Sequence, residues 1–245
     1  MENYTAAPDL LKAKTILVTG AGDGIGRTAA LTYAQHGATV ILLGRTVAKL
    51  EKVYDEIMTI SAPEPIIHPL DMQNASDEDY RILGDNILEQ CGQLDGLLHN
   101  AAILGPRTPI QFYPVDSWMQ LMQVNVNAPF MMTRALLPAL QAAPEASVIF
   151  TSSSVGRKGR AYWGAYSVSK FAVEGFMQVL SDELRQTSSI RVNSIDPGAT
   201  RTAMRKAAYP AEDPYTLKGP EDLMPLYLYL MGSDSKSVTG QALTA

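Results

Sequence analysis

The chain has 245 residues, of which 46% are hydrophobic and 18% are charged, and its formal net charge is −5. This length suffices for a substantial core, and the mildly acidic balance argues against binding to nucleic acid or to an anionic membrane, which needs clustered basic residues. One cysteine excludes an internal disulfide, three scattered histidines offer no metal-ligand spacing, and no apolar run reaches the roughly 20 residues of a membrane span. We therefore expect a cytoplasmic protein without a metal site or a membrane partner.

Short apolar runs rich in β-branched residues alternate with longer segments of helical period. The predicted strands are residues 15–20, 39–44, 65–70, 95–100, 147–152 and 190–195, with a seventh in 240–245. The predicted helices lie near 24–36, 46–60, 76–91, 116–141, 164–186 and 220–231. This alternation predicts an α/β protein, a doubly wound Rossmann-type sandwich whose parallel sheet of about seven strands carries helices on both faces. With no linker, charge block or internal repeat, residues 1–245 are expected to form a single domain.

The stretch TGAGDGIGR joins the first predicted strand to the first predicted helix. Its glycines do not fit the common G-x-G-x-x-G pattern, but they fit G-x-x-x-G-x-G at Gly20, Gly24 and Gly26. Glycines permit a tight turn, and the N-terminus of the helix offers free N–H groups to a pyrophosphate. We therefore expect Gly20, Asp23, Gly24, Ile25 and Gly26 to bind a dinucleotide, with an ordinary Gly-rich strand–helix turn as the alternative.

The second predicted strand ends in Gly44 and Arg45, where NAD-binding folds usually carry an Asp or Glu for the ribose 2′-OH. A guanidinium can instead pair bidentately with a 2′-phosphate. The sequence therefore favours NADP(H) as cofactor, with NAD(H) as the alternative. The alternative role for Arg45 is to begin the next helix at the surface. Asp23 is an electrostatic objection, because it would bring a negative charge near the phosphate.

The stretch GRAYWGAYSVSKFA carries two tyrosines four residues apart, Tyr162 and Tyr166, and Lys170 four residues beyond the second. A Tyr and a Lys at i and i+4 share one face of a helix, where the ammonium can lower the pKa of the phenol. A single pair of this kind also arises by chance, so it assigns no function by itself.

Taken together, the motifs resemble those of the short-chain dehydrogenases/reductases, of the single-domain type with a Tyr-x-x-x-Lys active site. The resemblance covers about residues 12–242, and its ordered set of landmarks is far more specific than one Tyr/Lys pair. The landmarks are Thr19-Gly-x-x-x-Gly-x-Gly26, Asp71, His99–Ala102, Asn125, Thr151–Gly156, Tyr166-x-x-x-Lys170 and Asp196–Thr202. Within the family, the stretches FTSSSVGR, GAYSVSKFA and MPLYLYLMG are most similar to a group of bacterial oxidoreductases.

The resemblance implies hydride transfer between NADPH and the carbon of a carbonyl or secondary alcohol. Tyr166 would give its proton to the forming alkoxide, because only Tyr166 has a lysine at +4 and a serine, Ser153, at −13. Ser153 would hold the carbonyl, and Asn125 would hold a water in a proton relay with Lys170. The cofactor contacts that the family implies are Asp71 at adenine, Asn100 and Ala101 on the adenosine side, Lys170 at the nicotinamide ribose with Tyr166 beside it, Pro197 and Gly198 along the nicotinamide, and Thr202 at its amide. Tyr162 and Trp163 are expected to be walls of the cleft or of a subunit contact.

One departure from the family pattern is Ala102, which stands where glycine is usual and would cost about 1 kcal/mol if that position needs a positive φ. Specificity is expected in the loops after the fifth and sixth strands. Their basic residues would suit an anionic substrate if they face the cleft, and a solvated basic loop is the alternative. These residues are Arg157, Lys158, Arg160, Arg201, Arg205 and Lys206. Met204, Tyr209, Met224 and Leu226 form either an apolar wall of the site or part of the core.

The motifs leave rival functions open. A non-catalytic dinucleotide-binding sensor or scaffold would keep the glycine turn, but it has no need of the intact Ser153–Tyr166–Lys170 set. Sugar-nucleotide epimerases and dehydratases resemble longer chains with an added substrate region. By the family resemblance we also expect a homodimer or homotetramer, paired through the helices near 116–141 and 164–186 and through the last strand.

Overall fold

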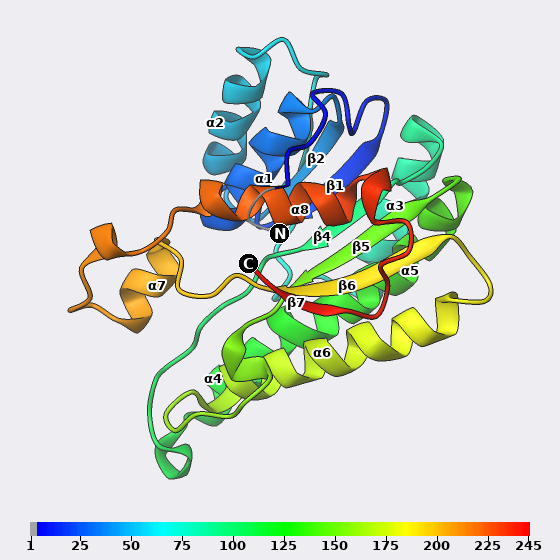
Figure 1. Cartoon of the computed structure of the whole chain (residues 1–245). Coiled ribbons are helices and arrows are strands. Elements are labelled where there is room, and N and C mark those ends of the chain that lie inside the picture. The colour runs from blue at the N-terminus through cyan, green and yellow to red at the C-terminus, as the bar shows by residue number, and fades with distance from the viewer. Residues whose placement is uncertain (1–3) are drawn as a thin grey trace.

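Seven parallel strands form one sheet in the computed structural model, which describes residues 4–245 (Figure 1). The strands are β1 (Thr15–Thr19), β2 (Thr39–Gly44), β3 (Ile66–Pro69), β4 (Gly96–His99), β5 (Ala146–Thr151), β6 (Ile190–Asp196) and β7 (Ala242–Thr244). Their order across the sheet is β3-β2-β1-β4-β5-β6-β7, and every neighbouring pair is parallel. The predicted Rossmann-type α/β class is therefore confirmed.

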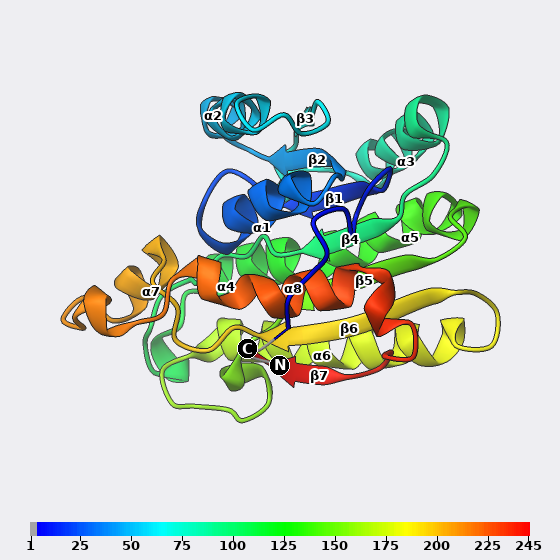
Figure 2. The same cartoon turned by 45° about the horizontal axis from the view of Figure 1, so that its top comes forward.

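Helices cover both faces of the sheet (Figure 2). They are α1 (Gly24–Gln35), α2 (Val47–Met58), α3 (Asp77–Cys91), α4 (Val115–Met122), α5 (Ala128–Ala142), α6 (Gly164–Leu184), α7 (Ala203–Ala208) and α8 (Met224–Met231). Short 3-10 turns lie at η1 (Ile110–Phe112), η3 (Ser154–Gly156), η4 (Pro214–Thr216), η5 (Pro220–Leu223) and η6 (Ser233–Ser235). None of the helices within residues 4–245 has the length and apolar character needed to cross a membrane.

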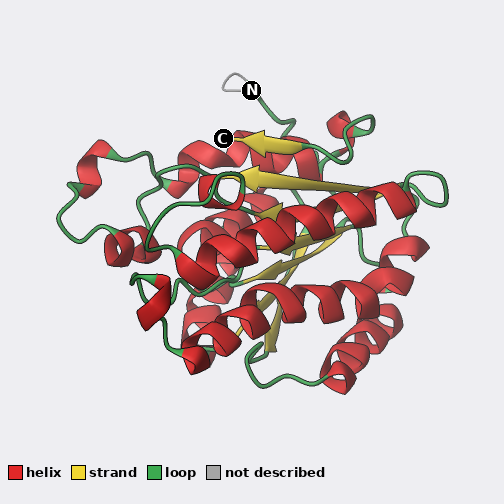
Figure 3. Cartoon of the chain, turned by 90° about the horizontal axis from the view of Figure 1, so that it is seen from below, coloured by secondary structure: helices red, strands yellow, loops and turns green. Residues whose placement is uncertain are grey.

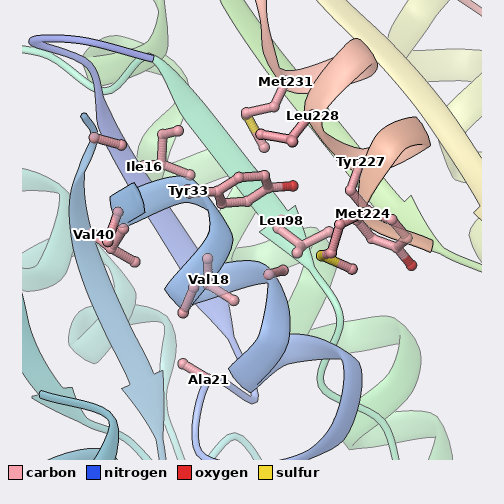
Figure 4. Close-up of a cluster of buried hydrophobic side chains, with 14 of the residues drawn as sticks. Ile16, Val18, Ala21, Tyr33, Val40, Leu98, Met224, Tyr227, Leu228 and Met231 are labelled. Carbon is pink, nitrogen blue, oxygen red and sulfur yellow. The ribbon is translucent and has the colours of Figure 1, made fainter. Parts of the chain in front are cut away.

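The core has two layers because successive strand residues point to opposite faces. Ile16 and Val18 pack on the side of α1, α2 and α8, whereas Leu17 packs on the side of α3, α5 and α6. Figure 4 shows the first layer, with Tyr33 of α1 and Tyr227 of α8 beside the strands. Figure 3, viewed from the side of α6, shows the helices of the second layer in front of the strands. Both faces of the sheet are thus covered, as near-continuous apolar strands predict.

Two elements differ from the sequence prediction. The helix expected over 116–141 is divided into α4 and α5 by a five-residue π-helical turn, η2 (Gln123–Asn127). The turn keeps the chain helical, so the apolar periodicity gives no sign of the division. Helix α7 was not predicted, because six residues are too few for a periodic pattern. Met224 and Leu226 belong to the core layer of α8, which settles one of the alternatives left by the sequence.

The sheet topology fixes the place where a ligand can bind. After β1 the chain moves outward to β2 and β3, and after β3 it returns to β4 on the other side of β1. Such a reversal leaves a crevice outside the carboxyl ends of the two central strands. The loops that follow β1, β4, β5 and β6 all converge there, so the segments that carry the sequence motifs are brought to one edge.

Candidate active site

A cleft of about 550 Å³ opens at this edge of the sheet. Its volume lies within the range of small-molecule and cofactor sites. Fourteen of the predicted site residues line it: Gly20, Asp23, Gly24, Ile25, Arg45, Asp71, Asn100, Ala101, Ser153, Tyr166, Lys170, Pro197, Gly198 and Thr202. Gly26 and Asn125 do not line it, and both have internal contacts that explain their position.

The glycine turn is held by a close contact between two of its own residues. A Cβ built on Gly26 would lie 2.3 Å from the carbonyl oxygen of Gly20, so only glycine lets the first turn of α1 pack against the end of β1. Gly20 itself has φ +68° and lies against Asn100 and Ala101 of the neighbouring loop. The turn therefore presents backbone to the cleft, while Gly26 shapes it from behind.

Thr19, the last residue of β1, joins the two central strands at the cleft. Its Oγ1 accepts hydrogen bonds from the backbone N–H groups of Asn100 (2.9 Å) and Ala101 (3.0 Å) and donates one to the carbonyl of Leu98 (3.2 Å). The sequence analysis used Thr19 only as the start of the glycine motif. The neighbouring Ala102 has no positive φ, so the strain that would follow from replacing glycine there does not arise.

The electrostatic objection to a phosphate beside Asp23 is removed by a lysine that the sequence analysis missed. Lys49 Nζ lies 2.5 Å from Asp23 Oδ2, and this hydrogen bond holds the pKa of the Asp23 carboxyl below its ordinary value. Arg45 and Lys49 both line the cleft, four residues apart at the start of α2. Their i, i+4 spacing was the signal that could have identified the second cation. With Asp23 paired, the guanidinium of Arg45 leaves this corner suited to an added negative charge.

Ser153, Tyr166 and Lys170 come together deep in the cleft. Lys170 is 3% exposed, its Nζ donates a 2.7 Å hydrogen bond to the carbonyl oxygen of Thr151, and it lies 5.6 Å from the centroid of the Tyr166 ring. Burial lowers the pKa of Lys170 to about 8 and raises the pKa of Tyr166 to about 12. The negative charge of Asp196 also raises the pKa of Tyr166, whereas a hydrogen bond with Ser153 lowers it. The expected lowering of the phenol pKa by Lys170 is therefore not found here, since burial is the largest influence on this pKa and it acts in the opposite direction.

Asn125 connects two walls of the cleft from behind. Its Oδ1 accepts from the N–H of Ile103 (2.8 Å), and its Nδ2 donates to the carbonyl of Ile103 (3.0 Å) and to Ser169 Oγ (3.1 Å). Ser169 Oγ in turn donates to the carbonyl of Tyr166 (2.8 Å). Asn125 thus fixes the loop after β4 to the turn of α6 that carries both Tyr166 and Lys170. It occupies the π-helical turn η2, a feature frequent at functional sites.

Two of the six basic residues expected near the substrate are engaged by carboxylates. Arg157 donates to the buried Glu174 (3.2 Å) and to the carbonyl of Leu243 (2.7 Å). Arg205, the only one of the six that lines the cleft, is paired bidentately with Glu212 at 2.6 Å through both contacts. Neither guanidinium keeps a free charge for an anion.

The far end of the cleft is apolar. Its side chains include Ile103, Leu104, Trp163, Met204 and Ala208, which pack in one small cluster with the ring of Tyr166. Trp163 thus forms a wall, as expected. Tyr162, in contrast, is 57% exposed and does not line the cleft. The expectation that it forms a wall is wrong, and only the subunit-contact alternative remains for it.

The residues present fit a dinucleotide better than a metal ion. Within residues 4–245 no cluster of three His, Cys, Asp or Glu side chains could hold a metal. The glycine turn at a helix N-terminus, the two cations at the end of β2 and a cleft that joins them are the features that a phosphorylated dinucleotide requires.

Comparisons with known proteins agree with this geometry. A family model described as short chain dehydrogenase matches residues 14–213. The oxidoreductase YciK of Escherichia coli (strain K12) is 53% identical over 243 residues, 99% of this chain and 96% of YciK, in line with the bacterial group indicated by the sequence. A short chain dehydrogenase from Pseudomonas syringae has 57% identity and a TM-score of 0.96, covering 100% of this chain and 99% of its own. Another short chain dehydrogenase, from Escherichia coli CFT073 and complexed with NADPH, has 53% identity and a TM-score of 0.95, and the match covers 98% of this chain and 99% of that one.

Proposed function

Because this chain belongs to the short-chain dehydrogenase/reductase family and is an oxidoreductase, we propose that it transfers a hydride between NADP(H) and a carbonyl or secondary alcohol carbon. The observation that carries the proposal is that Ser153, Tyr166 and Lys170 share one cleft with the glycine turn. We propose that residues 1–245 act as a single dinucleotide-binding and catalytic domain. Its substrates are small molecules.

Reduction leaves negative charge on the carbonyl oxygen, so a proton donor must face that oxygen. NADPH would supply the hydride. The Tyr166 hydroxyl donates its proton to the forming alkoxide, and the Ser153 hydroxyl holds the carbonyl oxygen beside it. Lys170 would hold the nicotinamide ribose and would keep a positive charge near the phenolate that remains, with Asn125 bracing the helix turn behind it.

With its pKa raised to about 12, the Tyr166 phenol is protonated at neutral pH, which is the form that serves as the acid in reduction. An alkoxide is a stronger base than a phenolate of this pKa, so proton transfer from the phenol is downhill. Oxidation of an alcohol would instead need the phenolate, which burial disfavours.

NADP(H) rather than NAD(H) is supported by charge. Arg45 and Lys49 line the corner of the cleft at the end of β2, and the acid of the glycine turn, Asp23, is already paired with Lys49. A 2′-phosphate would find a guanidinium there, with which it can pair bidentately. The related dehydrogenase complexed with NADPH is 53% identical to this chain.

We propose a homodimer or homotetramer on the basis of exposed apolar side chains on α5 and α6. Phe130, Val168, Phe171 and Val179 are between 42% and 56% exposed. Large apolar side chains gathered on neighbouring helices favour a protein–protein contact. Sedimentation of the purified protein tests this directly, and a monomer at micromolar concentration would contradict it.

The test of the main proposal is a screen of aldehydes and ketones with NADPH, run in parallel on Tyr166→Phe. We expect turnover to fall by about 10²–10⁴-fold in the variant. NADPH should still raise its thermal midpoint, because a ligand at 100 times its Kd adds about 2.7 kcal/mol. The exposed Tyr162→Phe is the matched control and should keep full turnover. NADPH binding with no turnover of any carbonyl would instead support the sensor or scaffold alternative.

A further inference from the structure

Arg107, an exposed residue, lies against the ring of Trp163, which lines the apolar end of the cleft. Cζ of Arg107 lies 4.8 Å from the centroid of the Trp163 ring and 4.7 Å from that of Tyr209, and the two rings are 6.0 Å apart. The three residues come from different segments: the loop after β4, the segment before α6 and the end of α7. Arg107 therefore lies where these three segments meet, next to a residue of the cleft wall, and its own side chain does not line the cleft.

Arg107 has no anionic partner in the part of the chain that the structure describes. No Asp or Glu of residues 4–245 forms a salt bridge with it, and its N–H groups make no hydrogen bond to those residues. The neighbouring Arg205 is held by Glu212, and Arg160 donates to the Tyr209 hydroxyl (3.2 Å). Arg107 is thus the cation of this group whose donors are not committed to a protein acceptor.

A guanidinium that packs against aromatic rings keeps its N–H donors free to bind an anion. Aromatic rings attract its flat face, whereas its N–H donors lie along the edge, in the plane of the group. Two parallel N–H groups on that edge match the two oxygens of a carboxylate. A guanidinium positioned by Trp163 and Tyr209 is therefore preorganised to bind a carboxylate, because the rings already restrict its rotamers.

The distance to the reacting group sets the form of the ligand. The centroid of the Trp163 ring lies 5.8 Å from that of the Tyr166 ring, so Cζ of Arg107 is separated from the centroid of the Tyr166 ring by no more than these two centroid distances combined. Ile103, Leu104 and Met204, which line the cleft and pack in the same cluster as Trp163 and Tyr166, are apolar. A molecule that reaches from the phenol to the guanidinium must cross an apolar stretch.

We propose that the substrate is a carbonyl compound with an apolar middle section and a terminal carboxylate, and that Arg107 determines specificity by binding this carboxylate. The inference rests on the proposed carbonyl reduction and adds the substrate class to it. The basic loops had already suggested an anionic substrate. Arg157 and Arg205 are paired with carboxylates of the protein, so we assign the recognition of the anion to Arg107 instead.

The test compares 8-oxooctanoate with its methyl ester as substrates for NADPH oxidation. We expect kcat/KM to be about 10- to 100-fold higher for the acid, the range of a charge-assisted hydrogen bond. Arg107→Gln should remove most of this acid-to-ester ratio, and Arg107→Lys should restore part of it, since lysine keeps the charge without the fork. Arg185→Gln, an exposed arginine beyond the far end of α6, changes the charge equally and should leave the ratio unchanged.

Two outcomes separate this inference from the proposed function. If both compounds are reduced equally well and Tyr166→Phe abolishes both reactions, the oxidoreductase proposal stands and Arg107 has only a structural role. If neither compound is turned over, the Kd values of octanoate and of octan-1-ol for the NADP⁺-loaded protein decide. Tighter binding of octanoate that Arg107→Gln weakens about tenfold or more supports the inference, and equal affinities overturn it.

Discussion

Nζ of Lys170 lies 5.6 Å from the centroid of the Tyr166 ring. The ammonium therefore faces the ring, and its hydrogen bond is made to the carbonyl oxygen of Thr151 at the end of β5. The i, i+4 spacing brings the two side chains to one face of α6, but the burial of both decides their protonation. Each group is held toward its neutral form, the lysine with a pKa of about 8 and the tyrosine with one of about 12.

The buried Lys170 should make stability rise with pH. Its pKa falls from 10.5 in the unfolded chain to about 8 in the fold, so between these values the unfolded chain binds a proton that the folded protein has released. The free energy of unfolding then gains up to about 1.4 kcal/mol per pH unit from this group, and below pH 8 the full cost of burying the ammonium is present. Tyr166 makes the free energy of unfolding fall with rising pH, but only above pH 10, where the unfolded chain begins to lose the phenol proton that the folded protein keeps.

Urea unfolding across this window should show a shallower rise with pH in Lys170→Met than in the natural chain. Lys52→Met, at an exposed position on α2, is the control and should reproduce the natural slope. Identical slopes for Lys170→Met and the natural chain would show that Lys170 keeps its proton in the fold.

Removing the guanidinium at the end of β2 should change cofactor choice. We expect Arg45→Gln to weaken NADPH binding by roughly 10- to 100-fold, since a hydrogen bond to a charged group contributes about 1.5–3 kcal/mol. NADH, which lacks the 2′-phosphate, should bind the variant as before. Titration calorimetry with both cofactors measures the two Kd values, and an equal loss for both would place Arg45 away from the phosphate.

Lys49 should act on the same phosphate through Asp23. Lys49→Met leaves the Asp23 carboxylate unpaired in the cleft, so we expect weaker NADPH binding from both the lost cation and the exposed anion. The double variant Lys49→Met/Asp23→Asn should recover part of the loss. A double variant that binds NADPH as weakly as Lys49→Met would show that Asp23 has no influence on the phosphate.

Two glycine substitutions should have opposite effects. Gly26→Ala places a Cβ 2.3 Å from the Gly20 carbonyl oxygen, so the turn must shift, and we expect a loss of about 1–3 kcal/mol with weaker NADPH binding. Gly175→Ala, in the interior of α6 with no atom within 4 Å of the new Cβ, should gain about 0.5–1 kcal/mol. Urea denaturation measures both, and a stable Gly26→Ala that binds NADPH normally would contradict the packing argument.

Asn125 should matter for stability as well as for turnover. Asn125→Ala leaves the buried N–H and carbonyl of Ile103 without their partner, which we expect to cost about 1–3 kcal/mol and to lower kcat by loosening α6 at Tyr166. Asn127→Ala, two residues along the same π-helical turn but exposed, is the matched control. If both variants unfold at the same urea concentration, the contacts of Asn125 are not stabilising.

The sequence by itself determined the architecture. The first six strands begin and end within one residue of their predicted bounds, because a strand buried on both faces is a short apolar run between turn residues and needs no distant information. The glycine spacing after β1 and the positions of Ser153, Tyr166 and Lys170 follow from the same local reading together with the family resemblance. These features depend on residues that are close together in the chain, so local sequence patterns are enough to predict them.

Only the tertiary structure decided which charges remain free and which groups are buried. Lys49 neutralises Asp23, Glu174 engages Arg157, and Glu212 engages Arg205. The partners of Arg107 lie 56 and 102 residues away in the chain. The pKa of Tyr166 depends on the packing around it, which reverses the shift that its spacing from Lys170 suggested. Pairing and desolvation arise from contacts between segments distant in sequence, so no local pattern encodes them, and they set the chemistry of this cleft.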